Sequence, residues 1–352
     1  MENKRISIII PIFNGALTIQ RCVNSILAQD YPNVEIILVN DGSQDDTLNV
    51  CRRLKLRYSN IKLLSQKNMG VSIARNNGIR YATGDYVCFA DSDDEYLDGA
   101  FQAAIDLCKD DSPDMIIGRV QLANDSSLEG ENGNSNLLRK YVNDELFNLK
   151  RWVMERDSLF LGSVNQNYVD SMNTFRMGSV WSKFFKRKLL ERVSFRPSLG
   201  MSEDLVFMYE IMGLVNEVFV TNMAWYSYTN NSTSVTHVKY SRTIIKDNLS
   251  LSKVLLSFKK DFDSEFEQFM YLKVIRCYWE SIVRGISSDE HITLIEKFKS
   301  LHRLNNIDEY RYAFKKMNIN NCKGIKNMVI CLFGKCHLSI FLLFFARYFR
   351  KE

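Results

Sequence analysis

The sequence predicts an α/β protein whose mostly parallel, doubly wound sheet is followed by a helical C-terminal region. In the first 118 residues, short apolar runs alternate with segments whose apolar residues recur at helical spacing. Continuous apolar runs are expected of parallel strands that helices cover on both faces. Residues 241–316 carry only the helical spacing, for example at Leu251, Val254 and Leu255, so helices should follow the sheet.

The elements of the first 118 residues follow from these two periodicities. Residues 6–12 (ISIIIPI) and 34–40 (VEIILVN) are the clearest buried strands, and Cys22 and Ile26 mark the apolar side of the first helix. Strands and helices that alternate with short connections imply a parallel sheet. We therefore expect strands at residues 6–12, 34–40, 61–65, 85–90 and 114–118, and helices at residues 15–29, 44–58, 71–82 and 98–109.

The pattern is less regular beyond residue 118. Residues 119–135 are rich in Gly, Asn and Ser, which indicates an exposed loop. We expect helices at residues 137–155, 182–192 and 202–214, the last with Ser202 as its N-cap, and short strands at residues 218–220 and 224–228.

Composition places the chain among globular proteins with a large core. It has 352 residues, of which 46% are hydrophobic and 25% charged, enough for two domains or one elaborated α/β domain. Its eight cysteines include no CxxC pair, and the first residues pass into a strand without a secretory signal. Free thiols in a reducing, cytoplasmic setting are therefore expected.

The net charge of +5 is concentrated in residues 323–352, where six basic residues accompany one acidic residue. Because the rest of the chain is neutral, binding to nucleic acid is not expected. Residues 328–349 are strongly apolar but contain Lys335 and His337, and a membrane-spanning helix needs about 20 predominantly apolar residues. A segment at the membrane surface fits better, and the alternative is a final helix packed on the protein's own core.

Polar and acidic side chains follow the first four predicted strands. Ligands of open parallel sheets bind outside the carboxyl ends of the strands, where these residues should meet. Some have a plain structural interpretation, since Asp41-Gly42 is a common turn dipeptide and Arg75 suits a helix surface. Together they indicate a site, made of Pro11, Phe13 and Asn14 after the first strand, Asp41 after the second, Asn68 after the third, and Asp91, Asp93 and Asp94 after the fourth.

The acidic group after the fourth strand points to a divalent cation. Carboxylates at close range raise one another's pKa, and a hard cation removes their repulsion. Mg²⁺ and Mn²⁺ prefer one or two carboxylates together with phosphate oxygens and water. With Arg75 nearby and Asp41 suited to accept hydrogen bonds from a base or ribose, the pattern describes a metal-bound nucleotide diphosphate.

Four motifs, IIIPIFN, ILVNDGSQDDT, NMGVSIARNNGI and GDYVCFADSDDEY, resemble in order and spacing the inverting family 2 glycosyltransferases of GT-A fold, of the bacterial surface-polysaccharide type. The resemblance is strong over residues 5–118 and weaker through VWSKFFKRKLL, MSEDLVF and YSYTNNSTSVTH. Two positions depart from the family pattern. Phe13 stands where the family often has tyrosine, and residues 229–236 lack a nearby arginine that often accompanies diphosphate binding.

The resemblance implies which residues bind the donor. Asp41 would contact the nucleobase, and Pro11, Phe13 and Asn14 would line the pocket for the base and ribose. Arg75 would lie near the base or the diphosphate.

The resemblance also implies the residues around the metal and the sugar. Asp91 would face the ribose or the metal, Asp93 would be the main metal ligand, and Asp94 would face the donor sugar or support the metal shell. His237 matches a late histidine that sometimes reaches the metal, although a lone histidine is more often structural. Trp181 is a candidate for the acceptor side together with Lys183, and equally a core aromatic.

Glu203 and Asp204 match the family's acidic pair, in which the aspartate is the catalytic base. Asp204 would lie in the first turn of a helix, where the helix dipole and free N–H groups favour the ionised carboxylate. Such a carboxylate can take the proton of an acceptor hydroxyl as that hydroxyl attacks the anomeric carbon and inverts it. Without the four motifs, this pair would be an ordinary acidic helix start.

The sequence thus predicts a metal-dependent inverting glycosyltransferase that uses Mn²⁺ or Mg²⁺ and moves a sugar from a UDP-sugar donor to a glycan or lipid-linked acceptor in cell-surface polysaccharide synthesis. Residues 1–118 and 119–238 would form the nucleotide-sugar and acceptor halves of the GT-A domain, residues 239–320 a helical region, and residues 321–352 a tail at the inner face of the cytoplasmic membrane. An oligomer is compatible with the sequence.

Two other classes of function stay open at this point. One is a phosphohydrolase or nucleotidyltransferase that uses the DxD acids, although no P-loop accompanies them. The other is a non-catalytic nucleotide-sugar-binding protein, against which the presence of both metal and base candidates weighs.

Overall fold

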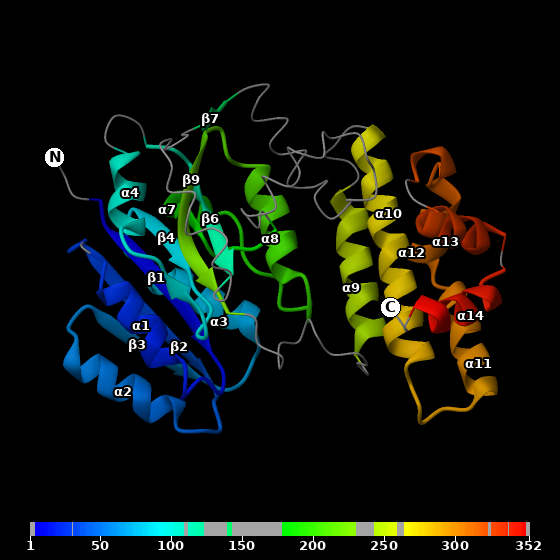
Figure 1. The fold of residues 1–352 in the computed structure, drawn as a ribbon, viewed down its shortest axis with the longest axis horizontal. Helices are drawn as coiled ribbons and strands as arrows, with labels where there is room; N and C mark the ends of the chain where they lie inside the picture. Colours follow the sequence, from blue (N-terminus) through cyan, green and yellow to red (C-terminus); the bar gives the residue numbers. More distant parts are fainter. Residues whose placement is uncertain are drawn as a thin grey trace. The chain divides into compact units, whose positions relative to one another are not determined.

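The computed structural model divides into two compact units, which we describe separately (Figure 1). Unit 1 takes its residues from Met1–Val153, Asp170–Pro197 and Glu203–Asn231, and unit 2 from Met154–Val169, Ser198–Ser202 and Ser232–Glu352. The structure describes residues 4–29, 31–108, 112–122, 139–142, 178–229, 243–258, 264–322, 325–336 and 338–349.

Unit 1 is built on a mixed sheet with the strand order β3-β2-β1-β4-β8-β6-β9-β5, and β7 pairs with β9. The first four strands of this order are parallel, as predicted for the N-terminal half, whereas β8 pairs antiparallel with both β4 and β6. The strands are β1 (Ile6–Ile12), β2 (Val34–Asp41), β3 (Ile61–Gln66), β4 (Tyr86–Phe89), β5 (Glu95–Tyr96), β6 (Met115–Leu122), β7 (Arg139–Tyr141), β8 (Lys183–Lys186) and β9 (Val218–Tyr228).

Helices cover both faces of the parallel half of the sheet, which is why β1 and β2 are buried along their whole length. Ile8 and Ile10 of β1 belong to the cluster that contains the buried side chains of α1 and α2. Ile9 points the other way and packs on α3, where an added Cβ at Gly78 would lie 2.3 Å from its Cγ2. The helices of unit 1 are α1 (Ile19–Leu27), α2 (Thr47–Arg57), α3 (Val71–Tyr81), α4 (Ala100–Asp106), α7 (Arg187–Leu190) and α8 (Glu203–Met212).

Several sequence-based boundaries after residue 118 are wrong. The helix expected at residues 182–192 begins instead as strand β8, because Phe184 and Phe185 are both fully buried where this segment pairs between β4 and β6. Its helical part is only α7. Strand β6 continues to Leu122 into the expected loop, residues 139–141 are strand rather than helix, and residues 218–228 form one strand rather than two.

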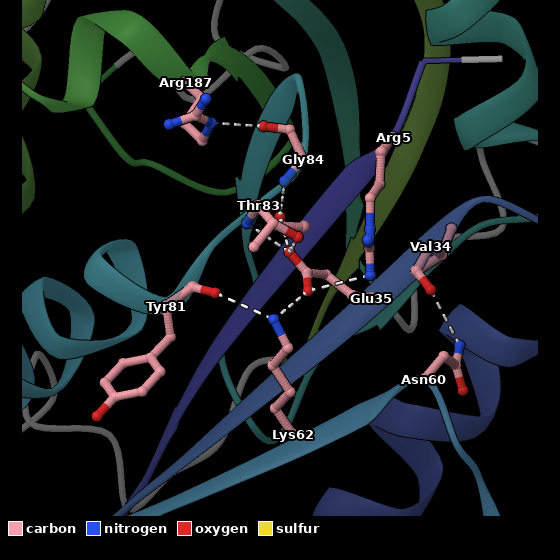
Figure 2. Close-up of polar contacts among 10 residues, drawn as sticks. Arg5, Val34, Glu35, Asn60, Lys62, Tyr81, Thr83, Gly84 and Arg187 are labelled. Carbon is pink, nitrogen blue, oxygen red and sulfur yellow. Dashed lines mark hydrogen bonds and ion pairs between the residues drawn. The ribbon is translucent and has the colours of Figure 1, made fainter. Parts of the chain in front are cut away.

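A buried carboxylate ties the amino-terminal ends of three strands together (Figure 2). Glu35 of β2 accepts hydrogen bonds from the Ser7 hydroxyl at 2.5 Å and from the Thr83 backbone N–H at 2.6 Å. Its other oxygen pairs with Lys62 at 2.7 Å and with Arg5 at 3.3 Å. These contacts supply the partners that a buried charge requires, so Glu35 stabilises the fold. It is not part of the polar group at the opposite, carboxyl edge of the sheet.

Unit 2 is helical, as predicted for residues 241–316 (Figure 1). Its longest helices, α9 (Ile244–Ser257) and α10 (Ser264–Glu280), pack against each other, and a π-helical segment at Ser281–Ser287 continues α10. The remaining helices are α11 (Leu294–Asn305), α12 (Asp308–Lys316), a 3-10 turn at Ile319–Asn321, α13 (Ile325–Lys335) and α14 (Ile340–Phe349).

The apolar tail forms the two short helices α13 and α14. Ile330 and Cys331 of α13, and Leu342 and Ala346 of α14, are buried within unit 2. Part of the tail therefore packs on its own unit, which was the alternative to a membrane-surface segment. Within the described ranges, no helix has the length and apolar character needed to cross a membrane. All eight cysteines are free thiols, as predicted.

Candidate active site

The loops after β1 and β2 are fixed to each other at the carboxyl edge of the sheet. The backbone N–H of Asn14 donates to the Ser43 hydroxyl at 3.0 Å, and the Asn14 side-chain oxygen accepts from the Gln44 backbone N–H at 2.8 Å. Asn14 has φ 54°, a left-handed conformation that asparagine adopts more readily than most residues. Asn14 therefore holds the loop after β1 against the loop after β2, partly through its own side chain.

Asp41, at the end of β2, holds the turn that begins α3. Its carboxylate is buried and accepts hydrogen bonds at 2.8 Å from the Gln66 side chain and from the backbone N–H groups of Met69 and Gly70. One of its two oxygens has a single protein partner among these bonds, which leaves it capacity for another donor. The sequence predicted Asp41 at this edge, but not its role in fixing the start of α3.

The side chains around Asp41 differ in exposure. Pro11 is buried within β1, whereas Phe13 is 46% exposed and Asn68 and Met69 are also exposed. Because these residues follow adjacent parallel strands, they lie at the same edge of the sheet. An exposed aromatic ring beside a carboxylate can stack on a flat ring whose edge donates hydrogen bonds.

Arg75 of α3 joins three acidic residues that are far apart in the sequence. Its Nη2 donates to Asp91 at 3.1 Å, and its Nη1 donates to Glu203 at 3.0 Å and also to Asp204. The Arg75 side chain is only 4% exposed, and its guanidinium lies 5.2 Å from the centre of the Phe195 ring. Arg75 thus connects the end of β4 to the start of α8.

The segment before α8 is also fixed to α3. The Asn76 side chain donates to the carbonyl of Phe195 at 2.7 Å and accepts from its backbone N–H at 2.8 Å. The Phe195 ring stacks on Phe207 of α8 with ring centres 4.0 Å apart. Neighbouring residues of α3, Arg75 and Asn76, therefore place the acidic start of α8 through two independent contacts.

The protonation of Asp204 differs from the sequence-based expectation. Burial raises the pKa of Asp204 to about 8, against the opposing effect of Arg75, and Glu203 and Asp91 raise it further. Burial likewise raises the pKa of Asp91, although Arg75 lowers it. The sequence-based argument considered only the helix start, which favours the ionised form; burial acts in the opposite direction, and the net shift of the pKa is upward. A carboxylate with a raised pKa is a stronger base.

Asp94 is held inside unit 1 rather than at its surface. It is fully buried, and it accepts hydrogen bonds from the Tyr226 hydroxyl at 2.9 Å and from the Thr229 backbone N–H at 2.8 Å. The same hydroxyl accepts from the backbone N–H of Asp91 at 3.0 Å. Burial, with Asp91 adding to it, raises the pKa of Asp94 to about 8. Asp94 therefore anchors the acidic loop, a role that its position in the motif did not reveal.

Arg21 is a residue that the sequence reasoning missed. From α1 it donates to the backbone carbonyl of Asp93 at 2.7 Å and pairs with Glu95 at 3.0 Å. Glu95 begins β5. No local signal marks Arg21, because the contact joins residues more than seventy positions apart.

The structure brings Arg75, Asp91, Glu203 and Asp204 into one cluster, and places Asp41, Phe13, Asn14 and Asn68 on the neighbouring loops. Trp181 is largely buried and stacks on Tyr226 with ring centres 5.2 Å apart, which supports its core interpretation. Lys183 is fully buried. His237 lies outside the described residues.

Residues 7–181 match the family model described as "Glycosyl transferase family 2". The chain is a family 2 glycosyltransferase. Among curated proteins, the cholesterol galactosyltransferase of Borreliella burgdorferi is 24% identical to this glycosyltransferase over 324 residues, which cover 88% of this chain and 87% of that one.

Solved structures share the GT-A-like fold of this glycosyltransferase. TarS 1-349 of S. aureus in complex with UDP-GlcNAc has a TM-score of 0.68 and 18% identity, covering 99% of this chain and 92% of that chain. The mannosyltransferase PcManGT of Pyrobaculum calidifontis, in complex with GDP-Man and Mn²⁺, has a TM-score of 0.50 and 15% identity, covering 96% of this chain and 88% of that chain. At these identities the likeness shows the fold alone.

The oxygen donors of this glycosyltransferase fit a divalent cation only in part. Asp91 and Asp93, one residue apart after β4, are partly exposed carboxylates of the type that Mg²⁺ and Mn²⁺ accept. Within the described residues, no three potential ligands gather at one point. The protein thus offers two carboxylates, which suits a cation whose other ligands are phosphate oxygens and water.

Proposed function

We propose that the protein is a metal-dependent inverting glycosyltransferase that transfers a sugar from a UDP-sugar to a glycan or lipid-linked acceptor in the synthesis of a cell-surface polysaccharide. The observation that carries the proposal is the position of Asp204, which shares the Arg75 guanidinium with Asp91. A candidate base and a candidate metal ligand are thereby held at one site.

The nucleotide would bind at the edge formed by the loops after β1, β2 and β3. Phe13 offers an exposed ring for stacking, and Asp41 offers a carboxylate oxygen for the N–H group of a pyrimidine base. Pro11, Asn14 and Asn68 complete this edge. The UDP-GlcNAc named for TarS supports a uridine nucleotide. Arg75 and Asp91 would lie toward the diphosphate in this arrangement.

Asp91 and Asp93 would hold Mn²⁺ or Mg²⁺, with His237 as a further candidate ligand. The Mn²⁺ named for PcManGT supports this choice. When bound, the cation supplies positive charge that stabilises the diphosphate leaving group. Asp94 is buried away from solvent, so we assign it to holding the acidic loop in place rather than to the donor sugar.

Asp204 would act as the general base. Its carboxylate accepts the proton of an acceptor hydroxyl while the oxygen of that hydroxyl forms a bond to the anomeric carbon. The bond from that carbon to the diphosphate breaks on the opposite side, and the configuration inverts. Arg75 keeps the carboxylate in place, and Glu203 shares this contact. General bases of this kind contribute about 10²–10⁴-fold to rate.

The further assignments extend this proposal to the whole chain. We propose residues 1–118 and 119–238 as the two halves of the catalytic domain, residues 239–320 as a helical region and residues 321–352 as a membrane-associating tail. The protein would act at the inner face of the cytoplasmic membrane, where lipid-linked acceptors are accessible to it.

Measuring nucleotide release tests the reaction type. With Mn²⁺ and a panel of UDP-sugars, UDP release should depend on an added acceptor. Release at full rate without an acceptor would instead support a phosphohydrolase, and binding without any turnover would support a non-catalytic protein.

Asp204→Asn tests the base. This variant should lose at least about 10²-fold in transfer rate while UDP-dependent thermal stabilisation stays as in the wild type. Glu191→Gln, a change at an exposed carboxylate at the end of α7, is the control and should keep full activity. Transfer by Asp204→Asn at the wild-type rate would refute the assignment.

A further inference from the structure

Most of the exposed large apolar side chains described in unit 2 lie on the last two helices and the connection between them, while Leu294 and Ile295 lie on α11. On α13, Met328 and Leu332 are exposed one turn apart, and on α14, Phe341 and Phe344 are 52% and 53% exposed. Their spacing places each pair on one face of its helix. Leu338 and Ile340 are exposed at the connection between them. We call Met328, Leu332, Leu338, Ile340, Phe341 and Phe344 the apolar tail surface.

The opposite faces of the same helices are packed, so the tail is ordered against its own unit. Ile330 on α13 is only 3% exposed, and Leu342 and Ala346 on α14 are completely buried. The ring centres of Phe333 and Phe341 lie 5.8 Å apart, which joins the two helices beside the apolar tail surface. Exposed apolar groups that a fold gathers in one place mark an interaction site more often than isolated ones do.

A pocket of about 660 Å³ adjoins this surface. Its lining includes Arg311 and Lys315 of α12, Lys335 at the end of α13, and Ser339. Ser339 lies between Leu338 and Ile340 in the chain, so the pocket reaches the connection of the apolar tail surface. Three basic side chains line it against one acidic side chain, that of Asp308, which pairs with Arg311 at 4.0 Å, and Lys335 also donates to the Met317 carbonyl. The lining keeps a net positive charge, which favours an anionic ligand.

The charged residues of the chain around the pocket and the apolar tail surface are almost all basic. No acidic residue occurs between Glu309 and Glu352, a stretch that contains the apolar tail surface and all three of the pocket's basic residues. A phosphate group carried on an apolar body would match both features, because the pocket attracts the phosphate and the exposed Phe and Leu side chains contact the body. The surface of an anionic lipid bilayer has this composition.

We propose that unit 2 docks on an anionic lipid bilayer, with the apolar tail surface in contact with the acyl chains and the basic pocket at a lipid phosphate. Helices of 11 and 10 residues are too short to cross the bilayer, so they lie along it. The membrane association proposed above for residues 321–352 is thereby assigned to one face of two packed helices and to a pocket on α12. The proposal does not depend on the reaction that the protein catalyses.

Flotation with lipid vesicles tests the proposal, using the full chain without donor or acceptor. Vesicles of phosphatidylcholine mixed with phosphatidylglycerol should bind the protein, and vesicles of phosphatidylcholine alone should bind it at least about fivefold more weakly for each basic residue engaged. Added salt should weaken the binding, because it screens the charge.

Two double variants separate the apolar and basic parts. Phe341→Ser with Phe344→Ser should lower vesicle binding about tenfold or more, and Arg311→Gln with Lys315→Gln should lower it only on phosphatidylglycerol vesicles. The matched controls lie on α11, where Leu294→Ser with Ile295→Ser and Lys299→Gln with Arg303→Gln also change exposed side chains. The controls should bind as the wild type does. Circular dichroism checks that all variants are folded.

Three results would overturn the proposal. Undiminished binding of the Phe341 and Phe344 variant would show that the apolar tail surface does not contact lipid. Equal binding to both vesicle types would show that the basic pocket does not recognise anionic lipid. Absence of vesicle binding, together with self-association that the same variant abolishes in analytical ultracentrifugation, would show that the surface joins copies of the chain instead.

Discussion

Glu35→Gln tests whether the buried carboxylate at the amino-terminal edge of the sheet stabilises unit 1. The Glu35 side chain is 1% exposed and accepts hydrogen bonds or ion pairs from Ser7, Thr83, Lys62 and Arg5. Glutamine keeps one acceptor oxygen for Ser7 and Thr83. Its amide group, however, places N–H donors against the two cations, so those contacts are lost.

The expected loss of stability follows from the pKa of this carboxyl. Although burial raises it, Lys62, Ser7 and Thr83 lower the pKa of Glu35 from 4.5 to about 2. A pKa unit corresponds to about 1.4 kcal/mol, so the ionised form gains about 3 kcal/mol from folding. Because Lys62 and Arg5 are 41% and 44% exposed, solvent screens part of this gain. We expect Glu35→Gln to cost about 2 kcal/mol at neutral pH.

The lowered pKa of Glu35 also determines how the stability difference between wild type and Glu35→Gln depends on pH. A carboxyl whose folded pKa is depressed contributes stability above its unfolded pKa and loses that contribution as the pH falls through its folded pKa. The difference between wild type and variant should therefore be constant above about pH 5 and shrink between about pH 4.5 and pH 2.

Hydrogen–deuterium exchange in increasing urea, read from peptides of β1 and β2, measures the stability of unit 1 without contributions from unit 2. Glu191→Gln is the control, since Glu191 is 61% exposed and pairs with its helical neighbour Arg187 at 3.1 Å. Glu191→Gln should lower the free energy of unfolding of unit 1 by less than about 0.5 kcal/mol. A Glu35→Gln penalty as small as that of the control, or one that does not shrink in acid, would refute the reasoning.

The remaining predictions concern the active site. Arg75→Met removes the cation that lowers the pKa of Asp204, so the pH midpoint of kcat/KM should move to higher pH and the rate should fall about 10²-fold or more; an unchanged midpoint would contradict the assignment. Arg75→Lys keeps the charge but not the fork of donors, so it should restore the midpoint more than the rate. EDTA should abolish transfer and added Mn²⁺ should restore it, measured as UDP release; activity that survives complete chelation would contradict metal dependence.

The parallel half of the fold could be predicted because its signals are local. Runs such as ISIIIPI and VEIILVN are continuous only where a strand is covered on both faces, and the structure buries both from end to end. The polar residues that follow these strands were placed correctly at one edge, because parallel strands align their carboxyl ends.

The antiparallel strands were less predictable because their neighbours come from distant parts of the chain. Residues 182–192 were expected to form a helix, and only the pairing of Lys183–Lys186 between β4 and β6 makes this part a strand. Likewise, the Tyr226 hydroxyl that holds Asp94 is more than a hundred residues away from it. The sequence contains these residues but not the contact between them.

The ionisation of Asp204 could not be predicted for a related reason. A helix start lowers the pKa of a carboxyl by a local effect that the sequence reveals, whereas burial raises it through the packing of the whole site. In the structure the second effect is larger. Glu203 and Asp91 raise the Asp204 pKa further. Glu203 is the neighbouring residue in the sequence, whereas Asp91 is brought to the same guanidinium only by the fold.

Arg75 therefore explains why a motif on α3 and an acidic pair on α8 belong to one site. A guanidinium is a planar fork of five N–H donors, and here its two terminal nitrogens contact Asp91 on one side and Glu203 and Asp204 on the other. The fork fixes the separation of these carboxylates, which an ammonium group would not do. Any movement of α8 relative to the end of β4 must then break an ion pair of a side chain that is almost completely buried. The proposed base and the proposed metal-side carboxylate are consequently positioned together by Arg75, which needs to touch neither reacting atom in this proposal.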